Sequence, residues 1–146
     1  MTSFKKILCS VDFSDHSKLV AAHAASLARL SGGTVLVLYA APSLSQYVGF
    51  HVPPNSIENF VGEIVTGAEK AMENFVAENF GDVKAEGRIV IGYAAEEILS
   101  LADKEQVDVI VMGTHGRKGI DRILFGSVAE KVVKSATQPV LTIRPS

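Results

Sequence analysis

The sequence contains a single cysteine, Cys9, and therefore lacks the partner for an internal disulfide bond. Cys9 lies in an apolar stretch, so we expect a small buried side chain rather than a redox-active thiol. No stretch approaches the ~20 consecutive apolar residues that a membrane-spanning helix needs. The opening residues also lack the apolar segment and small-residue cleavage site of a secretory signal. These absences lead us to expect a soluble cytoplasmic protein with no membrane partner.

The chain also has little net charge and no metal-binding spacing. Its 14 Lys and Arg residues and 16 Asp and Glu residues leave a formal net charge of -2. Proteins that bind nucleic acids usually carry a basic stripe, so this balance argues against a nucleic-acid partner. The four histidines show neither H-x-x-x-H spacing nor paired cysteines. We therefore expect no metal site built from protein ligands alone.

What the sequence does contain is enough apolar material for one hydrophobic core. Hydrophobic residues make up 47% of the 146-residue chain, and charged residues make up 21%. A chain of this length can build a core without metals or disulfides. No internal repeat, low-complexity segment or linker divides the sequence, so we predict one domain over residues 1–146.

Short apolar stretches alternate with helical patterns along the whole chain. The stretches typical of strands covered on both faces of a parallel sheet are residues 4–11, 34–41, 83–91, 107–112 and 139–144. The third of them has a polar first half, which favours a position at the edge of the sheet. Strands that alternate with helices in this way predict a mainly parallel α/β sheet with right-handed crossovers.

Capping residues mark where two of the helices begin. Ser14 is the expected N-cap of the first helix, and Asp15 stands where the helix dipole favours a carboxylate. Asn55 or Ser56 is the expected cap of the long second helix, which Gly81 ends.

Residues 42–54 are the least regular segment, between the second strand and the second helix. Loops of this length are uncommon in compact domains and are often functional. The segment includes Tyr47 and Phe50. These aromatic residues either form a lid or partner surface, or pack among themselves in an ordinary surface excursion. The sequence leaves both interpretations open.

The segment after the fourth strand carries widely spaced glycines. Gly113 is followed by two residues and Gly116, and then by nine residues and Gly126-Ser127, where the last helix opens. Backbone amides that no side chain covers, at the positive end of a helix dipole, suit an anion such as phosphate. These amides and the α/β pattern predict a nucleotide-binding α/β domain. The glycine spacing is neither that of a Walker P-loop nor that of a dinucleotide fingerprint.

Several of these residues have purely structural alternatives. Ser127 is followed three residues later by Glu130, which would make an ordinary capping box. Asp12, after the first strand, could simply fix the turn before Ser14. Gly116 could be a turn residue with a positive φ angle.

Charged residues beside the glycines also allow two interpretations. Arg117, Lys118 and Arg122 could neutralise phosphate charge, or could form a solvated basic segment. His115 could donate to a ligand or face water.

The ordered set of motifs resembles the universal stress protein family. The pattern G-x2-G-x9-G-[ST], after VIVM and leading into GSVAEKVV, is similar to the ATP-binding signature of that family. The segments ILCSVDFS, GYAAEEIL and PVLTIRP also resemble the family pattern, so the resemblance covers essentially the whole chain. It implies a five-stranded parallel sheet of strand order 3-2-1-4-5 sandwiched by helices. Such a fold is Rossmann-like and similar to that of the adenine nucleotide alpha hydrolases.

The resemblance further implies an adenine nucleotide, expected to be ATP, across the carboxyl ends of the first and fourth strands. Whether Mg²⁺ or Mn²⁺ accompanies it stays open. A general rule for open α/β sheets favours the same place, because ligands bind where the strand order reverses. By position, the implied contacts to adenine, ribose and phosphate are Val11, Asp12, Phe13, Ala40, Met112, Gly113, Gly116, Gly126, Ser127 and Val128, with Arg117 as a neighbouring cation.

No catalytic constellation stands out in the sequence. Fast ATP hydrolysis needs a positioned water, charge neutralisation and usually a carboxylate that holds a metal. Asp12 is the one obvious carboxylate, and it belongs to the nucleoside end. We expect a regulatory stress-response protein with the nucleotide as ligand and at most slow hydrolysis. A weak ATPase and an interaction module without nucleotide are the alternatives.

The fifth strand predicts an oligomeric state. Residues 140–144 are apolar on both faces and end the sheet, where an unpaired edge would promote aggregation. Pairing with the same strand of a second copy would cover that edge by two-fold symmetry, and the family resemblance implies the same homodimer. A strand covered by its own helices is the alternative.

Overall fold

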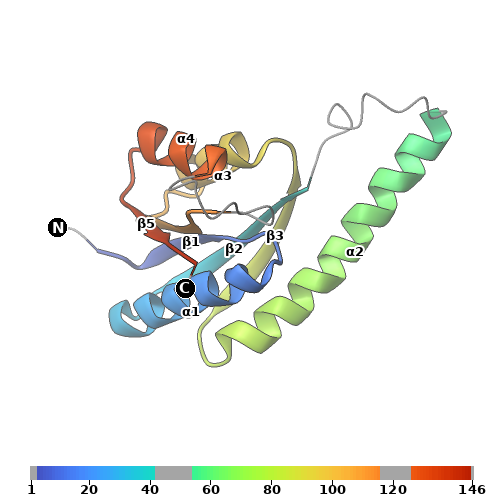
Figure 1. Cartoon of the computed structure of the whole chain (residues 1–146). Coiled ribbons are helices and arrows are strands. Elements are labelled where there is room, and N and C mark those ends of the chain that lie inside the picture. Colours follow the sequence, from blue (N-terminus) through green and yellow to red (C-terminus); the bar gives the residue numbers. More distant parts are fainter. Residues whose placement is uncertain (1–2, 42–53, 116–125, 146) are drawn as a thin grey trace.

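The computed structural model describes residues 3–41, 54–115 and 126–145. Strands and helices alternate along these residues (Figure 1). The strands are β1 (Lys6–Ser10), β2 (Thr34–Ala41), β3 (Ala85–Ile91), β4 (Val109–Gly113) and β5 (Val140–Ile143). The helices are α1 (Asp15–Ser31), α2 (Pro54–Phe80), α3 (Ala94–Lys104) and α4 (Ser127–Ser135). The predicted alternation is confirmed, with element ends that differ by one or two residues.

All neighbouring strands pair in parallel, in the order β3-β2-β1-β4-β5. This confirms the strand order 3-2-1-4-5 that the resemblance implied. It also places β3 at one edge of the sheet, as its polar first half predicted, and β5 at the other. The first four strands are linked by long crossovers that include helices, as parallel pairing requires.

The sheet is covered on both faces (Figure 1). Helices α1 and α2 lie on one face, and α3 and α4 lie on the other. Side chains alternate along each strand, so β1 sends Ile7 and Cys9 into the cluster beneath α1 and α2, and Leu8 into the cluster beneath α3 and α4. Because helices cover both faces of the sheet, the strands carry apolar residues on both faces, and this explains their sequence pattern.

Cys9 is fully buried, as the sequence predicted. Burial in apolar surroundings disfavours the thiolate and raises the pKa of the Cys9 thiol to about 12. A thiol with so high a pKa has almost no thiolate at neutral pH and is therefore chemically inert.

The second helix begins earlier than predicted. Its first residue is Pro54, so neither Asn55 nor Ser56 is the N-cap, and that prediction is wrong. Proline is well suited to the first helical position, because its missing N–H has no acceptor there in any case. In Figure 1, α2 diverges from the sheet toward its N-terminal end. The predicted loop over residues 42–54 lies outside the described residues except for Pro54.

Within the described ranges, no helix combines the length and apolar character needed to cross a membrane.

Candidate functional site

The strand order reverses between β1 and β4, which are neighbours in the sheet. Helix α1 leaves β1 on one face, while α4 precedes β5 on the other, so the carboxyl ends of β1 and β4 lie where open α/β sheets generally bind ligands. Cys9 pairs with Val111 in register, three residues before Asp12 and two before Gly113. The two polar segments singled out in the sequence therefore leave the sheet side by side.

Asp12 organises the turn between β1 and α1. Its Oδ1 atom accepts hydrogen bonds from the Ser14 N–H at 2.9 Å and from the buried Ser17 hydroxyl at 2.9 Å. The Ser17 Oγ atom in turn accepts the Asp12 N–H at 3.1 Å. Ser14 is the N-cap, as predicted, but its side chain makes no capping bond. The structural role considered for Asp12 is thus confirmed, and its contact with a nucleoside stays a prediction.

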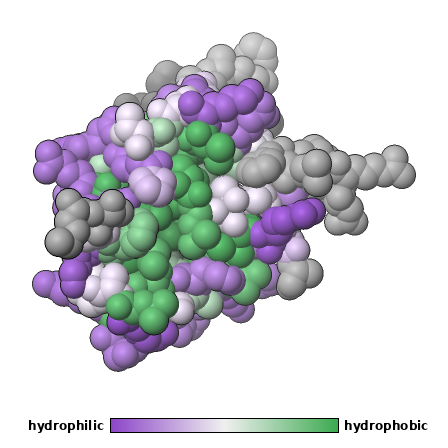
Figure 2. Space-filling view, turned by 90° about the vertical axis from the view of Figure 1, so that its left-hand side faces the viewer, coloured by the Kyte–Doolittle hydropathy of each residue, from purple (hydrophilic) through white to green (hydrophobic). Residues whose placement is uncertain are grey.

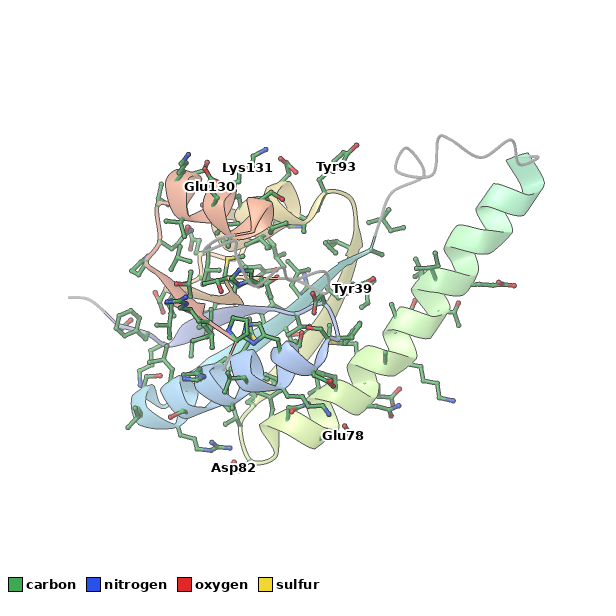
Figure 3. The ribbon with its side chains drawn as sticks, viewed as in Figure 1. Tyr39, Glu78, Asp82, Tyr93, Glu130 and Lys131 are labelled. Atoms are coloured by element: carbon green, nitrogen blue, oxygen red, sulfur yellow. The ribbon has the colours of Figure 1, made fainter. Side chains whose placement is uncertain are left out.

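Phe13 adopts an unusual backbone conformation beside Asp12. Its φ angle is 63°, in the left-handed region, which costs a residue other than glycine about 1–2 kcal/mol. The ring packs 4.8 Å from Tyr39 and 5.8 Å from Phe75, measured between ring centroids, and this packing offsets the cost. Figure 3 shows Tyr39 near the end of β2, beside this turn. Strain of this kind tends to occur at binding sites.

Gly113 is required by the close approach of His16, which sequence reasoning missed. A Cβ atom at position 113 would lie 2.7 Å from the His16 Nε2 and Cδ2 atoms. His16 Nε2 donates to the Ile143 carbonyl at 2.9 Å, and the Thr114 N–H donates to the same carbonyl at 3.0 Å. One carbonyl therefore joins α1, the end of β4 and β5.

The composition of α1 allows this approach. Its buried residues are Ser17, Val20, Ala21, Ala24, Ala25 and Ala28, and most of them are small. Small side chains let the helix lie close to the sheet, so that the short imidazole of His16 reaches Gly113. No local sequence pattern indicates this contact, because His16 and Ile143 are 127 positions apart.

Gly126 closes the site from the side of α4. It is the N-cap residue, with φ -72° and ψ 163°, and its N–H donates to the Thr114 carbonyl at 2.7 Å. Its own carbonyl accepts the first bond of the helix, from the Glu130 N–H at 3.0 Å. The capping box considered for Ser127 and Glu130 is therefore wrong, because Ser127 is already inside the helix. A Cβ atom at Gly126 would lie only 3.2 Å from the Thr114 oxygen.

The first turn of α4 offers donors for an anion. The N–H groups of Ser127, Val128 and Ala129 have no acceptor within the helix, as in any first turn. No acceptor for them occurs among the backbone bonds of the described residues. The Gly126 N–H, in contrast, is already bonded to Thr114. The N–H groups of Ser127 and Val128 are therefore donors that an anion could use, at a place where the helix dipole also favours negative charge. Their contact with phosphate stays a prediction.

Other predicted contact residues can reach a ligand mainly through their main chain. Val11 and Met112 are buried in the apolar clusters on opposite faces of the sheet, and Ala40 is half-buried near the end of β2. Gly116 and Arg117 lie outside the described residues, as do Lys118 and Arg122. Nowhere in the described ranges do His, Cys, Asp and Glu side chains form a group able to hold a metal ion.

Comparison with known proteins covers nearly the whole chain. Residues 3–144 match the universal stress protein family. The universal stress protein MJ0531 of Methanocaldococcus jannaschii is 36% identical over 144 residues, which span 97% of this chain and 82% of the relative.

Two solved structures extend the comparison. The structure of hypothetical protein MJ0577, whose sequence comes from the same archaeon, has a TM-score of 0.86 and 30% identity, and the match covers 99% of both chains. A universal stress protein from Archaeoglobus fulgidus, solved in complex with dAMP, has a TM-score of 0.68 and 26% identity. That match covers 98% of this chain and 99% of the relative.

Proposed function

Because the chain belongs to the universal stress protein family, we propose that it binds an adenine nucleotide, ATP, at the carboxyl ends of β1 and β4. The nucleotide acts as a regulatory ligand in a stress response. A ligand that binds the folded state adds stability by mass action, and it can favour one conformation over another.

One observation carries this proposal. The bond from the Gly126 N–H to the Thr114 carbonyl fixes the start of α4 directly beside the end of β4. The N–H groups of Ser127 and Val128 are thereby presented next to the carboxyl end of β4. The dAMP complex of the Archaeoglobus fulgidus relative supports an adenine nucleotide as the occupant.

Charge decides which way the nucleotide lies. The Asp12 carboxylate would repel phosphates at the end of β1, whereas the first turn of α4 attracts them. The triphosphate therefore points to Ser127 and Val128, and the nucleoside lies toward Asp12 and β2. In this proposal the main chain of Ala40 reads the edge of the adenine. Arg117 and a divalent ion, Mg²⁺ or Mn²⁺, would neutralise the remaining phosphate charge.

Binding rather than turnover fits the described side chains. Fast phosphoryl transfer needs a group that positions water and a carboxylate that holds the metal near the γ-phosphate. Asp12 is at the nucleoside end, and its Oδ1 atom already accepts two hydrogen bonds. Hydrolysis is accordingly slow, and a phosphate-release assay would detect only a small fraction of the turnover of a dedicated ATPase.

Calorimetry tests the binding proposal. ATP titrated into the purified chain should bind saturably, and AMP should bind more weakly because it leaves fewer charges at α4. Gly126→Val should weaken ATP binding by about tenfold or more, because the added atoms push α4 away from Thr114 and disturb charge-assisted bonds worth about 1.5–3 kcal/mol each. Equal affinities for AMP and ATP would contradict the triphosphate part of the proposal.

We also propose that two copies pair through β5. Figure 2 shows apolar side chains gathered in a band across the side of the molecule that carries β5. Leu141 of β5 and Val133 of α4 are 41% and 45% exposed, although both are large and apolar. Pairing of β5 with its symmetry mate would cover this surface and the open strand edge. Light scattering should give the mass of two chains at micromolar concentration; the mass of one chain would contradict the pairing.

A further inference from the structure

A groove lies at the β3 edge of the sheet, which is opposite the β5 edge and away from the proposed nucleotide site. One side of α2 and residues 85–89 of β3 line this open groove, whose volume is about 600 Å³. Figure 1 shows α2 running alongside β3 and diverging from it. Strand β3 is the outer strand here, with β2 as its neighbour on the inner side.

The backbone of β3 presents open hydrogen-bonding groups along this groove. Val35 donates to the Lys84 carbonyl at 3.0 Å, and the Gly92 N–H donates to Ala41 at 2.9 Å. The even-numbered residues of this segment therefore face β2. Because successive residues of a strand direct their N–H and C=O groups to opposite sides, Ala85, Gly87 and Ile89 direct theirs outward. No bond of the described backbone outside the sheet uses these groups.

The floor of the groove is apolar. Met72 and Val76 of α2 lie opposite Ala85 and Ile89 of β3, and all four belong to the core cluster on this face or pack against it. Gly87 lets Met72 lie directly on the strand, because a Cβ atom there would be 2.3 Å from the Met72 Cγ atom. A side chain at position 87 would lift Met72 and with it α2.

The rim of the groove is acidic. Glu69, Glu73 and Glu86 line it together with Arg88, so three carboxylates and one guanidinium leave a net charge of -2. Arg88 is already paired with Glu105 at 3.5 Å and with Glu86 at 3.6 Å. The ion pairs of the described residues include neither Glu69 nor Glu73. These two carboxylates on α2 are the rim charges available to a basic partner.

We propose that this groove binds an extended peptide segment with alternating basic and apolar side chains, added as a further strand beside β3. The open N–H and C=O groups select an extended backbone, whose side chains alternate between the two faces of the sheet. The basic side chains face α2, where their methylene stems lie on the apolar floor and their charges reach Glu69 and Glu73. The apolar side chains face the other side of the sheet. A second copy of the chain is a poorer occupant. Two-fold pairing of β3 would bring the two acidic rims together, and like charges that face each other are destabilising.

The probe for this site is a fluorescein-labelled peptide of alternating lysine and valine, titrated with the full chain and followed by fluorescence anisotropy. Saturable binding with a dissociation constant below about 1 mM is expected, which corresponds to about -4 kcal/mol. A peptide with glutamate in place of lysine should not bind. A peptide with N-methyl groups on alternate residues keeps the charge but cannot complete the strand, so its affinity should fall by about tenfold or more.

Charge-reversal variants locate the site on the protein. The double variant Glu69→Lys/Glu73→Lys should lose about tenfold or more in affinity for the lysine–valine peptide. The matched control Glu63→Lys/Glu78→Lys makes the same charge change at exposed positions of α2 that do not line the groove, and should bind nearly as the original chain does. Figure 3 shows Glu78 near the C-terminal end of α2. Far-ultraviolet circular dichroism spectra that match the spectrum of the original chain would show that both variants are folded.

Four results would overturn the proposal. Equal binding of the N-methylated peptide would reduce the interaction to ionic attraction. Equal loss in both double variants would assign it to net charge alone. Absence of saturable binding would show that the groove does not take such a peptide. Self-association of the chain that competes with the peptide would show that a second copy occupies the groove. None of these results bears on the nucleotide site, which lies between other strands.

Discussion

Gly113→Ala should lower the free energy of unfolding by about 1–3 kcal/mol, which is the usual cost of forcing an extra methyl group into a packed site. The reason is the imidazole of His16, whose Nε2 and Cδ2 atoms would be 2.7 Å from the new Cβ atom. The ring cannot simply rotate away, because Nε2 holds the Ile143 carbonyl at 2.9 Å. For a chain of this size, thermal unfolding should shift down by about 2–4 °C for each kcal/mol.

A double-mutant cycle isolates the cause of that loss. His16→Ala alone should also destabilise the chain, since it removes the bond to Ile143. Combined with Gly113→Ala, however, it removes the clash, so the double variant should be at least about 1 kcal/mol more stable than the sum of the two losses predicts. Additive losses in chemical denaturation would contradict the contact between His16 and Gly113.

Gly67→Ala in α2 is the matched control for the glycine substitution. Among the described residues, no atom other than those of its chain neighbours and of the helix's own backbone lies within 4 Å of a Cβ built at Gly67. The same chemical change there should stabilise the chain by up to about 1 kcal/mol, because glycine is unfavourable inside a helix.

Ser127→Pro should weaken ATP binding by about tenfold or more while leaving the stability of the fold nearly unchanged. Proline is well tolerated at the first position of a helix, and Ser127 is the first residue of α4. The preceding residue must be extended, and Gly126 already is, with φ -72° and ψ 163°. The substitution therefore deletes one N–H donor from the proposed phosphate site without disturbing the helix that presents it.

Ser127→Ala separates the amide of this residue from its hydroxyl. It keeps the N–H and loses the Oγ atom, so its affinity for ATP should lie much closer to that of the original chain than to that of the proline variant. Calorimetry with both variants decides between the two groups. Equal losses would show that the hydroxyl, and not the main chain, holds the phosphates.

The general layout of the site could be predicted from the sequence because it depends on periodicity and topology. Apolar strands that alternate with helices require a parallel sheet, and the strand order implied by the family resemblance places the ends of β1 and β4 together. That is why Asp12 and Gly113 were expected on neighbouring strands, and the structure confirms their proximity.

The details that organise the site depend on contacts that local sequence does not encode. The packing of His16 on Gly113 joins segments far apart in the chain, and it follows from how closely α1 approaches the sheet. The left-handed backbone of Phe13 is set by its packing on Tyr39 and Phe75. The alternative that makes Ser127 the cap of α4 is wrong by one residue, because the bond from Gly126 to Thr114 fixes where the helix begins.

The groove beside α2 was also beyond prediction from sequence. The sequence indicated that β3 is an edge strand, but the outward direction of the Ala85, Gly87 and Ile89 amides follows from the register with β2. Glu69 and Glu73 could not be assigned to a groove rim from the sequence, because their position there depends on how α2 lies along that edge.

The most direct test of the nucleotide site is the amide NMR spectrum of isotope-labelled protein during titration with ATP. If main-chain donors at the start of α4 hold the phosphates, the amide signals of Ser127 and Val128 should show some of the largest shifts and saturate with the calorimetric affinity. Unchanged Ser127 and Val128 signals at saturating ATP, with shifts confined to other parts of the chain, would contradict the account.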